Sequence, residues 1–130
     1  MSLTVRVITP DKVVWDASVE ELILPSSTGQ LGILSGHAPL LTALDIGVMR
    51  LKNNGIWSSI VLMEGFAEVE NNKVTILSNG AEEASKIDVK KAQSDLEKVT
   101  LLVDQAETKK EKIEATIELR KAKARLQAIA

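Results

Sequence analysis

Short runs of apolar residues recur through the first 80 residues with the spacing of β-strands. In LTVRVI (3–8), Leu3, Val5 and Val7 occupy alternate positions, which is typical of a strand with one buried face. Further runs rich in β-branched and apolar residues lie at 19–25, 47–52, 56–64, 66–70 and 73–78. The pattern predicts a strand at each of these runs.

Turn-forming residues separate the runs. They occur at Pro10-Asp11, over PSSTG (25–29), at Asn53-Asn54-Gly55 and at Asn71-Asn72. Asn54-Gly55 is a strong hairpin signal because both residues tolerate positive φ. Several short strands at this spacing predict an antiparallel β sandwich or a flattened barrel.

At Asp88 the period changes to that of a helix, with Asp88 itself a candidate N-cap. Apolar residues then recur at steps of three and four, at Val89, Ala92, Leu96, Val99, Val103 and Ala106. A second such series comprises Ala115, Leu119, Ala122, Leu126 and Ile129, flanked by Ile113 and Ile117.

No glycine or proline follows Gly80, so the tail is either one long helix or two helices joined near 104–111. Thr108-Lys-Lys-Glu111 has the spacing of a capping box and favours a second helix starting there. We therefore predict an α+β chain: an antiparallel β sandwich over 1–84, then a two-helix hairpin over 85–130.

The two helical faces are rich in alanine and valine, and burial of alanine contributes little free energy. We expect such a hairpin to depend on the sandwich or on a partner for its position. An element held this weakly is suited to a two-state switch.

Composition narrows the class of protein. Only Trp15, Trp57 and Phe66 are aromatic, so the core is expected to be aliphatic, and cysteine is absent, which excludes disulfides. No secretory signal is recognisable, and no stretch approaches the roughly 20 apolar residues that span a bilayer. We expect a soluble chain.

Charge is unevenly distributed. Residues 1–87 carry six basic and ten acidic side chains, and residues 109–130 carry seven and three, a net of +4. This asymmetry indicates either an acidic partner for the tail or an acidic face on the chain's own body. Because the tail lacks interleaved aromatic residues and the chain is acidic overall, no nucleic-acid binding is expected.

No catalytic or metal-binding constellation is recognisable. With one histidine and no cysteine, nucleophilic triads and histidine-based metal sites have no support, and no phosphate-binding glycine motif occurs. We expect neither an enzyme nor a metalloprotein.

The run LGILSGHAPLL (31–41) breaks the strand pattern. It contains the single histidine, His37, and Gly32, Gly36 and Pro39 interrupt an otherwise apolar stretch, which predicts a loop. His37 has three interpretations: a catalytic base, a turn residue satisfied by local backbone, or part of an exposed contact loop. Apolar loops that face outward are typical of interaction surfaces.

The basic residues of the tail also have two interpretations. They form either a solvated helix face with internal pairs such as Glu118–Lys121 and Glu114–Lys110, or a surface that binds an acidic partner. The set comprises Lys109, Lys110, Lys112, Arg120, Lys121, Lys123 and Arg125.

The segment GQLGILSGHAPLLTAL (29–44) closely resembles the signature segment of ε subunits of F-type ATP synthases. The frame agrees, with VRVITPDKVVW near the start and VTILSNGAEEASKID where the body ends. The resemblance covers the whole chain, and LILPSSTGQLGILSGHAPLL is most similar to the cyanobacterial and chloroplast branch.

This resemblance implies a β sandwich followed by two helices, in a non-catalytic rotor subunit. Such a subunit joins the γ subunit to the membrane-embedded c-ring and couples proton-driven rotation to ATP synthesis. The implied location is peripheral on the thylakoid membrane, at its cytoplasmic or stromal face, with attachment only through the complex.

In the family, the segment that faces the polar loops of the c subunits matches Gln30, Leu31, Gly32, Ile33, Leu34, Ser35, Gly36 and His37. The glycines would let it lie close to the ring, and His37 with Pro39 would shape it, without proton transfer by His37. Some members carry a carboxylate at the position of Gln30, so a charge pair from that position is lost here.

The resemblance also implies that the helices either fold down on the sandwich or extend along γ into the catalytic head, where they obstruct hydrolysis. The seven basic tail residues are then candidates to contact an acidic segment of the β subunit. Exposed pairs contribute about 0–1 kcal/mol each, so a collective, salt-sensitive effect is expected.

Some bacterial members bind ATP through an Ile-Asp-x-x-Arg-Ala motif. This chain reads Ile87-Asp88-Val89-Lys90-Lys91-Ala92, so lysine replaces the arginine and its planar fork is lost. Asp88 and Lys91 are the residues that match this motif, and because of the lysine we expect ATP binding by the isolated chain to be weak or absent. An ATP-sensing domain and a stand-alone protein-interaction module remain the alternative functions.

Overall fold

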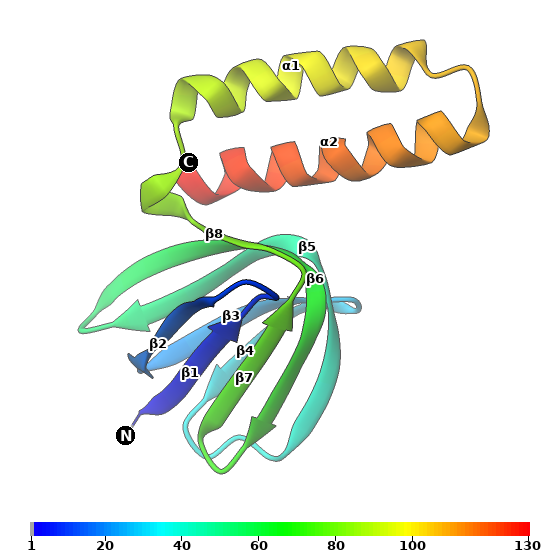
Figure 1. The fold of residues 1–130 in the computed structure, drawn as a ribbon. Coiled ribbons are helices and arrows are strands. Elements are labelled where there is room, and N and C mark those ends of the chain that lie inside the picture. The colour runs from blue at the N-terminus through cyan, green and yellow to red at the C-terminus, as the bar shows by residue number, and fades with distance from the viewer. Residues whose placement is uncertain (1) are drawn as a thin grey trace.

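The computed structural model describes residues 2–130, and over that range eight strands precede two helices (Figure 1). The strands are β1 (Leu3–Ile8), β2 (Val13–Val19), β3 (Glu21–Ser26), β4 (Gly29–Leu34), β5 (Leu40–Asn53), β6 (Ile56–Glu70), β7 (Lys73–Ser78) and β8 (Ala81–Glu83). A 3-10 turn, η1 (Ala84–Lys86), leads to α1 (Val89–Gln105) and α2 (Lys109–Ile129). The predicted α+β class is confirmed.

The strands form one sheet in the order β2-β1-β7-β6-β5-β3-β4, with β8 paired to β6, and this sheet folds over on itself as a sandwich. All neighbouring strands run antiparallel except β1 and β7, which are parallel. The wholly antiparallel sheet predicted from the sequence is therefore wrong at this one pair. Parallel partners are joined by a long connection rather than a hairpin, so local turn signals do not reveal them.

The two longest strands are each longer than the runs predicted. The runs 56–64 and 66–70 belong to a single strand, β6, which bends at Glu64 and Gly65, where φ is 65° and 147°. Before the bend Ile60 and Leu62 point into the core, whereas after it Ala67 and Val69 do. The bend therefore changes which alternate residues face the core of the sandwich, and it makes one strand look like two in the sequence.

Three strands were not predicted: β2, β4 and the short β8. β2 and β4 lie at the two edges of the sheet, where most side chains are exposed and the period-two signal is weak. The loop predicted over 31–41 is wrong for Leu31–Leu34, which belong to β4, and for Leu40 and Leu41, which begin β5. An edge strand tolerates glycines such as Gly32 because it carries little packing.

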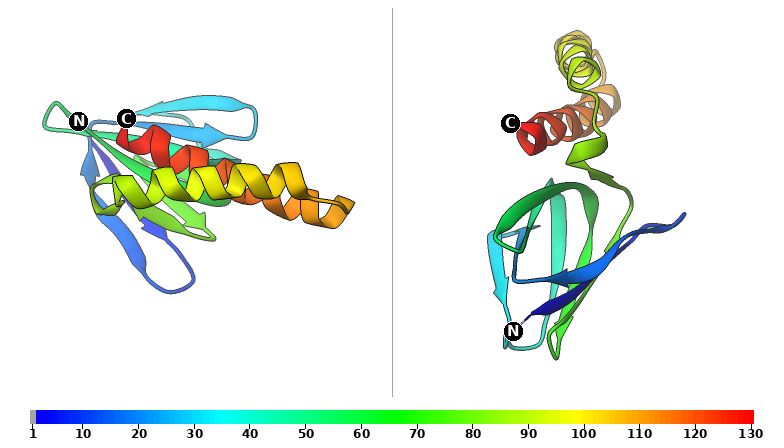
Figure 2. Two further views of the ribbon diagram at one scale, coloured as in Figure 1. Left: turned by 90° about the horizontal axis from the view of Figure 1, so that it is seen from above. Right: turned by 90° about the vertical axis from the view of Figure 1, so that its left-hand side faces the viewer.

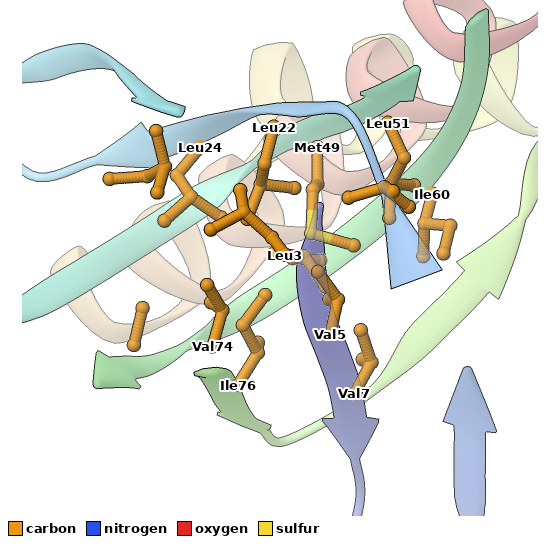
Figure 3. Packing of buried hydrophobic residues seen from close by; sticks show 14 of the residues in the cluster. Leu3, Val5, Val7, Leu22, Leu24, Met49, Leu51, Ile60, Val74 and Ile76 are labelled. Atoms are coloured by element: carbon orange, nitrogen blue, oxygen red, sulfur yellow. The ribbon is translucent and has the colours of Figure 1, made fainter. Parts of the chain in front are cut away.

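The core of the sandwich is aliphatic, as composition predicts (Figure 3). Side chains from both layers of the folded sheet meet there, and the largest completely buried ones include Leu3, Leu22, Leu24, Ile33, Met49, Leu51, Ile60, Leu62 and Ile76.

Both predicted helix caps are confirmed. The Asp88 Oδ1 accepts a hydrogen bond from the Lys91 backbone N–H at 3.2 Å, and the Thr108 Oγ1 accepts one from the Glu111 N–H at 3.1 Å. The Glu111 carboxylate accepts from the N–H of Glu107, one residue before the cap. The helices are thus separate, and among residues 2–130 neither is apolar and long enough to cross a bilayer.

The helices are stacked on the sandwich, with α2 between α1 and the sheet in both side views (Figures 1 and 2). Of the apolar face predicted for α1, only Ala92 is buried, and Val89 is 49% exposed. On α2, Ile117, Ala124 and Ala128 pack against β5 and β6, a contact face that the sequence did not indicate.

Candidate functional site

The segment Gln30–His37 alternates between the core and the surface. Within β4, Ile33 is completely buried and Leu31 packs against the core, whereas Gln30, Gly32 and Leu34 are exposed. The strand alternation therefore removes Ile33 from any contact surface that this segment offers.

After β4 the chain turns at Ser35 and Gly36, at the end of the sandwich opposite the helices (Figure 1). Gly36 has φ of 87°, which favours glycine, and its N–H donates to the Asn72 Oδ1 at 2.7 Å. Asn72 belongs to the turn between β6 and β7, so the two turns lie side by side and fix each other.

His37 is half-buried in this turn. Its backbone N–H donates to the Leu34 carbonyl at 3.1 Å, and its Nδ1 lies 2.7 Å from the Ala38 carbonyl oxygen. Because that oxygen only accepts, this contact assigns the proton to Nδ1. His37 is therefore held by local backbone, as its interpretation as a turn residue requires.

The seven basic residues of the tail do not form one surface. In the helix, Lys121 pairs with Glu118 at 3.4 Å, the predicted internal pair, whereas Arg120 lies 3.8 Å from Asp45 on β5. Lys109, Lys110, Lys112 and Lys123 are exposed, and no ion pair joins them to any part of residues 2–130. The predicted pair Glu114–Lys110 is likewise not formed.

Arg125 makes the best-defined polar contact between helix and sandwich. Its Nε lies 3.0 and 3.1 Å from the two Glu82 carboxylate oxygens, and its Nη2 lies 2.9 Å from Oε2. The hydrogen bonds to Glu82 raise the pKa of the Arg125 guanidinium above its ordinary value. Together with Arg120–Asp45, this pair shows that the basic tail faces acidic positions on the chain's own body.

Asp88 and Lys91 lie beside this ion pair. They line a cavity of about 380 Å³ with Glu82, Lys86, Asp95 and Arg125, so three carboxylates face three cations. The Asp88 carboxylate caps α1, and Arg125 is bound to Glu82. A polyphosphate placed here would meet carboxylates as close as cations, which opposes tight anion binding.

The described residues do not indicate a metal site. Over residues 2–130, no group of three or more His, Cys, Asp or Glu side chains is placed to hold a metal ion.

An exposed row of apolar residues crosses the outer face of the sandwich, and the sequence analysis did not predict it. Ala43, Phe66 and Leu77 are neighbours across β5, β6 and β7, and Phe66 and Leu77 are 57% and 54% exposed. A hollow of about 630 Å³ adjoins them. The sequence did contain a signal for it. Phe66 and Leu77 stand at positions of β6 and β7 that face solvent, where large apolar residues are uncommon.

Comparison with known proteins assigns the chain to a family. A family model for the β-sandwich domain of the ATP synthase delta/epsilon chain matches residues 2–84. The chloroplastic ATP synthase epsilon chain of Emiliania huxleyi is 80% identical over 130 residues, which cover all of both chains. The chain belongs to the ATP synthase epsilon subunit family.

Other relatives agree with the branch indicated by the sequence. The chloroplastic epsilon chain of Guillardia theta is 64% identical over 99% of this chain and 98% of its own length. The epsilon chain of the cyanobacterium Thermosynechococcus vestitus is 59% identical over 98% and 95%. The resemblance drawn from residues 29–44 is confirmed, and the family role is that of a non-catalytic subunit of the F-type ATP synthase.

Two solved structures of lower sequence identity share the fold. A chain of the Euglena gracilis mitochondrial ATP synthase, in an assembly described as OSCP/F1/c-ring, has a TM-score of 0.87 at 21% identity. That match covers 99% of this chain and 82% of the other. A chain of the Tetrahymena thermophila central stalk and c-ring has a TM-score of 0.65 at 15% identity, covering 100% and 98%.

Proposed function

We propose that this epsilon subunit couples c-ring rotation to ATP synthesis together with γ, and that its C-terminal helices inhibit ATP hydrolysis. The observation that carries the proposal is the separation of two surfaces at opposite ends of the sandwich. The Gln30–His37 segment ends in a turn at one end, and the helical hairpin with its basic residues lies at the other.

The contact with the c-ring is proposed for the exposed part of the Gln30–His37 segment. Gln30, Gly32 and Leu34 face outward, and Gly36 follows in the turn. The two exposed glycines let a partner approach the backbone closely, Leu34 adds apolar area, and Gln30 adds hydrogen bonding. The turn is braced by Asn72, so it presents a rigid surface suited to transmitting torque.

The inhibitory role is proposed for the hairpin because its attachment to the sandwich is slight. Apart from the ion pairs, α2 rests on β5 and β6 through Ile117, Ala124 and Ala128, two of which are alanines. Such a contact can open at modest free-energy cost and release basic side chains toward acidic segments of the catalytic α and β subunits.

The proposed location is the thylakoid membrane, at its cytoplasmic or stromal face, as part of the ATP synthase. Support comes from the chloroplastic and cyanobacterial relatives. Attachment through γ and the c-ring would need no membrane segment of the chain's own.

The decisive experiment is ATP hydrolysis by a matched α–β–γ assembly with the chain added whole or truncated after Ile87. We expect the whole chain to inhibit and the truncated chain to bind γ without inhibiting. If neither form binds or changes the rate, the proposed function is wrong.

The ring contact is tested by cross-linking, because the chain has no cysteine of its own. Leu34→Cys is expected to cross-link to c subunits in the intact complex. Ile56→Cys is the matched control, since Ile56 is equally aliphatic and 69% exposed but lies at the start of β6, next to another turn. Equal cross-linking of both variants, or of neither, would contradict the assignment.

A further inference from the structure

Two ion pairs join α2 to the sandwich. Arg125 binds the Glu82 carboxylate through two nitrogens at 2.9 to 3.1 Å, and the Arg120 Nη2 lies 3.8 Å from the Asp45 Oδ1. Asp45 lies on β5 and Glu82 on β8, so the two pairs hold the helix at two separate points.

Glu82 is well placed to control the hairpin. It lies on β8, where it is paired with Val61 of β6, and β8 leads through η1 into α1. Its backbone is therefore fixed by the sheet directly before the connection at which the hairpin leaves the sandwich. The next residue, Glu83, instead pairs with Lys86 at 2.8 Å, within the connection itself.

The apolar contact between α2 and the sandwich involves few residues of α2. Ala124 is buried, and Ile117 and Ala128 are partly buried against a patch formed by Ile46, Val48, Val61 and Met63. A bidentate guanidinium–carboxylate pair is among the stronger ion pairs and adds geometric specificity. The Arg125–Glu82 pair therefore adds to the docked position a geometric specificity that the apolar contact alone does not provide.

We propose that Asp45 and Glu82 form an acidic clasp that competes with an external acidic partner for Arg120 and Arg125. Docking of α2 then withholds these two cations, and opening of the clasp supplies them for inhibition. The proposal deepens the proposed function and rests on it. A guanidinium edge bound to Glu82 cannot bind a second carboxylate with the same N–H groups.

Six of the seven basic tail residues accordingly divide into two groups, and the seventh, Lys121, pairs with Glu118 within α2 itself. Arg125 becomes fully available only when α2 leaves the sandwich, and Arg120, 46% exposed and 3.8 Å from Asp45, is held more loosely. Lys109, Lys110, Lys112 and Lys123 are exposed in the docked state, so they are available in both states.

The clasp is tested first in the isolated full-length chain by amide hydrogen exchange over residues 117–128. Glu82→Gln is expected to increase exchange there roughly five- to tenfold, as loss of a charged hydrogen bond at a partly exposed site predicts. Arg125→Gln should do the same, and Glu83→Gln, one residue away, is the matched control. Equal protection in Glu82→Gln and Glu83→Gln would overturn the clasp.

Competition is tested by hydrolysis in the α–β–γ assembly. Glu82→Gln is expected to inhibit more strongly than the unchanged chain at limiting concentration. The exchanged pair Glu82→Arg with Arg125→Glu should recover protection of α2 but inhibit less, because a tail cation has become an anion. Faster exchange in Glu82→Gln with unchanged inhibition would overturn the competition.

The two proposals fail in distinguishable ways. If the unchanged chain does not inhibit hydrolysis, the proposed function and the competition both fail. The exchange measurement then still decides by itself whether Glu82 holds α2, because it needs no partner subunit.

Discussion

Among single residues, Glu64 and Gly65 have a large effect on the shape of the sandwich. Their positive φ values bend β6, so that this strand contributes to both layers and changes its buried side on the way. The buried hydroxyl of Ser78 lies 2.7 Å from the Glu64 carbonyl oxygen and stabilises the bend. The sheet folds over at a position that only a few residue types allow.

Gly65→Ala is expected to destabilise the chain by about 2–4 kcal/mol. A Cβ at this position would lie 1.9 Å from the Leu77 carbonyl oxygen, and φ of 147° is unfavourable for alanine. The free energy of unfolding, measured with urea, checks this. Gly32→Ala is the control, because nothing lies within 4 Å of its added Cβ, and a comparable loss in both variants would contradict the explanation.

Among the elements, the two helices differ in what holds them. α2 packs directly against the sandwich, whereas α1 packs on α2 and is separated from the sheet by it (Figure 1). Large apolar residues on the hairpin remain exposed, including Leu101 and Leu102 at 57% and 56%. With so little burial, local signals such as caps contribute a large share of helix stability.

Thr108→Ala is expected to destabilise α2 by about 1 kcal/mol, because it removes the acceptor for the Glu111 N–H. The loss of helical circular dichroism on heating should begin at a lower temperature. Thr116→Ala is the matched control on the same helix, since its hydroxyl only donates to the Lys112 carbonyl. Similar effects of both substitutions would show that capping is not the cause.

For the whole molecule, the fold brings the end of α2 back to the start of the hairpin. Glu82 on β8 and Arg125 near the end of α2 are 43 residues apart in the chain, yet they form the shorter of the two ion pairs between α2 and the sandwich. As a result, the cavity that Asp88 and Lys91 line carries equal numbers of carboxylates and cations. It therefore bears directly on nucleotide binding.

We expect isothermal titration calorimetry of the isolated chain with Mg-ATP to give no micromolar dissociation constant. Arg125 is bound to Glu82, and Lys91 lacks the planar fork of arginine. Lys91→Arg alone should restore little affinity while Glu82 still binds Arg125. Micromolar affinity in the unchanged chain would contradict this prediction.

Signals carried by neighbouring residues predicted much of the fold. The strands at 3–8 and 73–78, the Asn54-Gly55 hairpin and the caps at Asp88 and Thr108 were each confirmed. The sequence failed where exposure weakens periodicity, at the edge strands β2 and β4. It also failed where a backbone bend changes the buried side, at Glu64 and Gly65.

By itself the sequence determined the α+β class, the aliphatic core, the two helices and the family, because these depend on local periodicity, composition and a contiguous signature. Only the tertiary structure decided that Ile33 is buried, that β1 and β7 run parallel, and that Arg125 binds Glu82. These depend on contacts between distant parts of the chain, which no local pattern encodes. The same charges that suggested an acidic partner for the tail are divided by the fold between its own body and solvent.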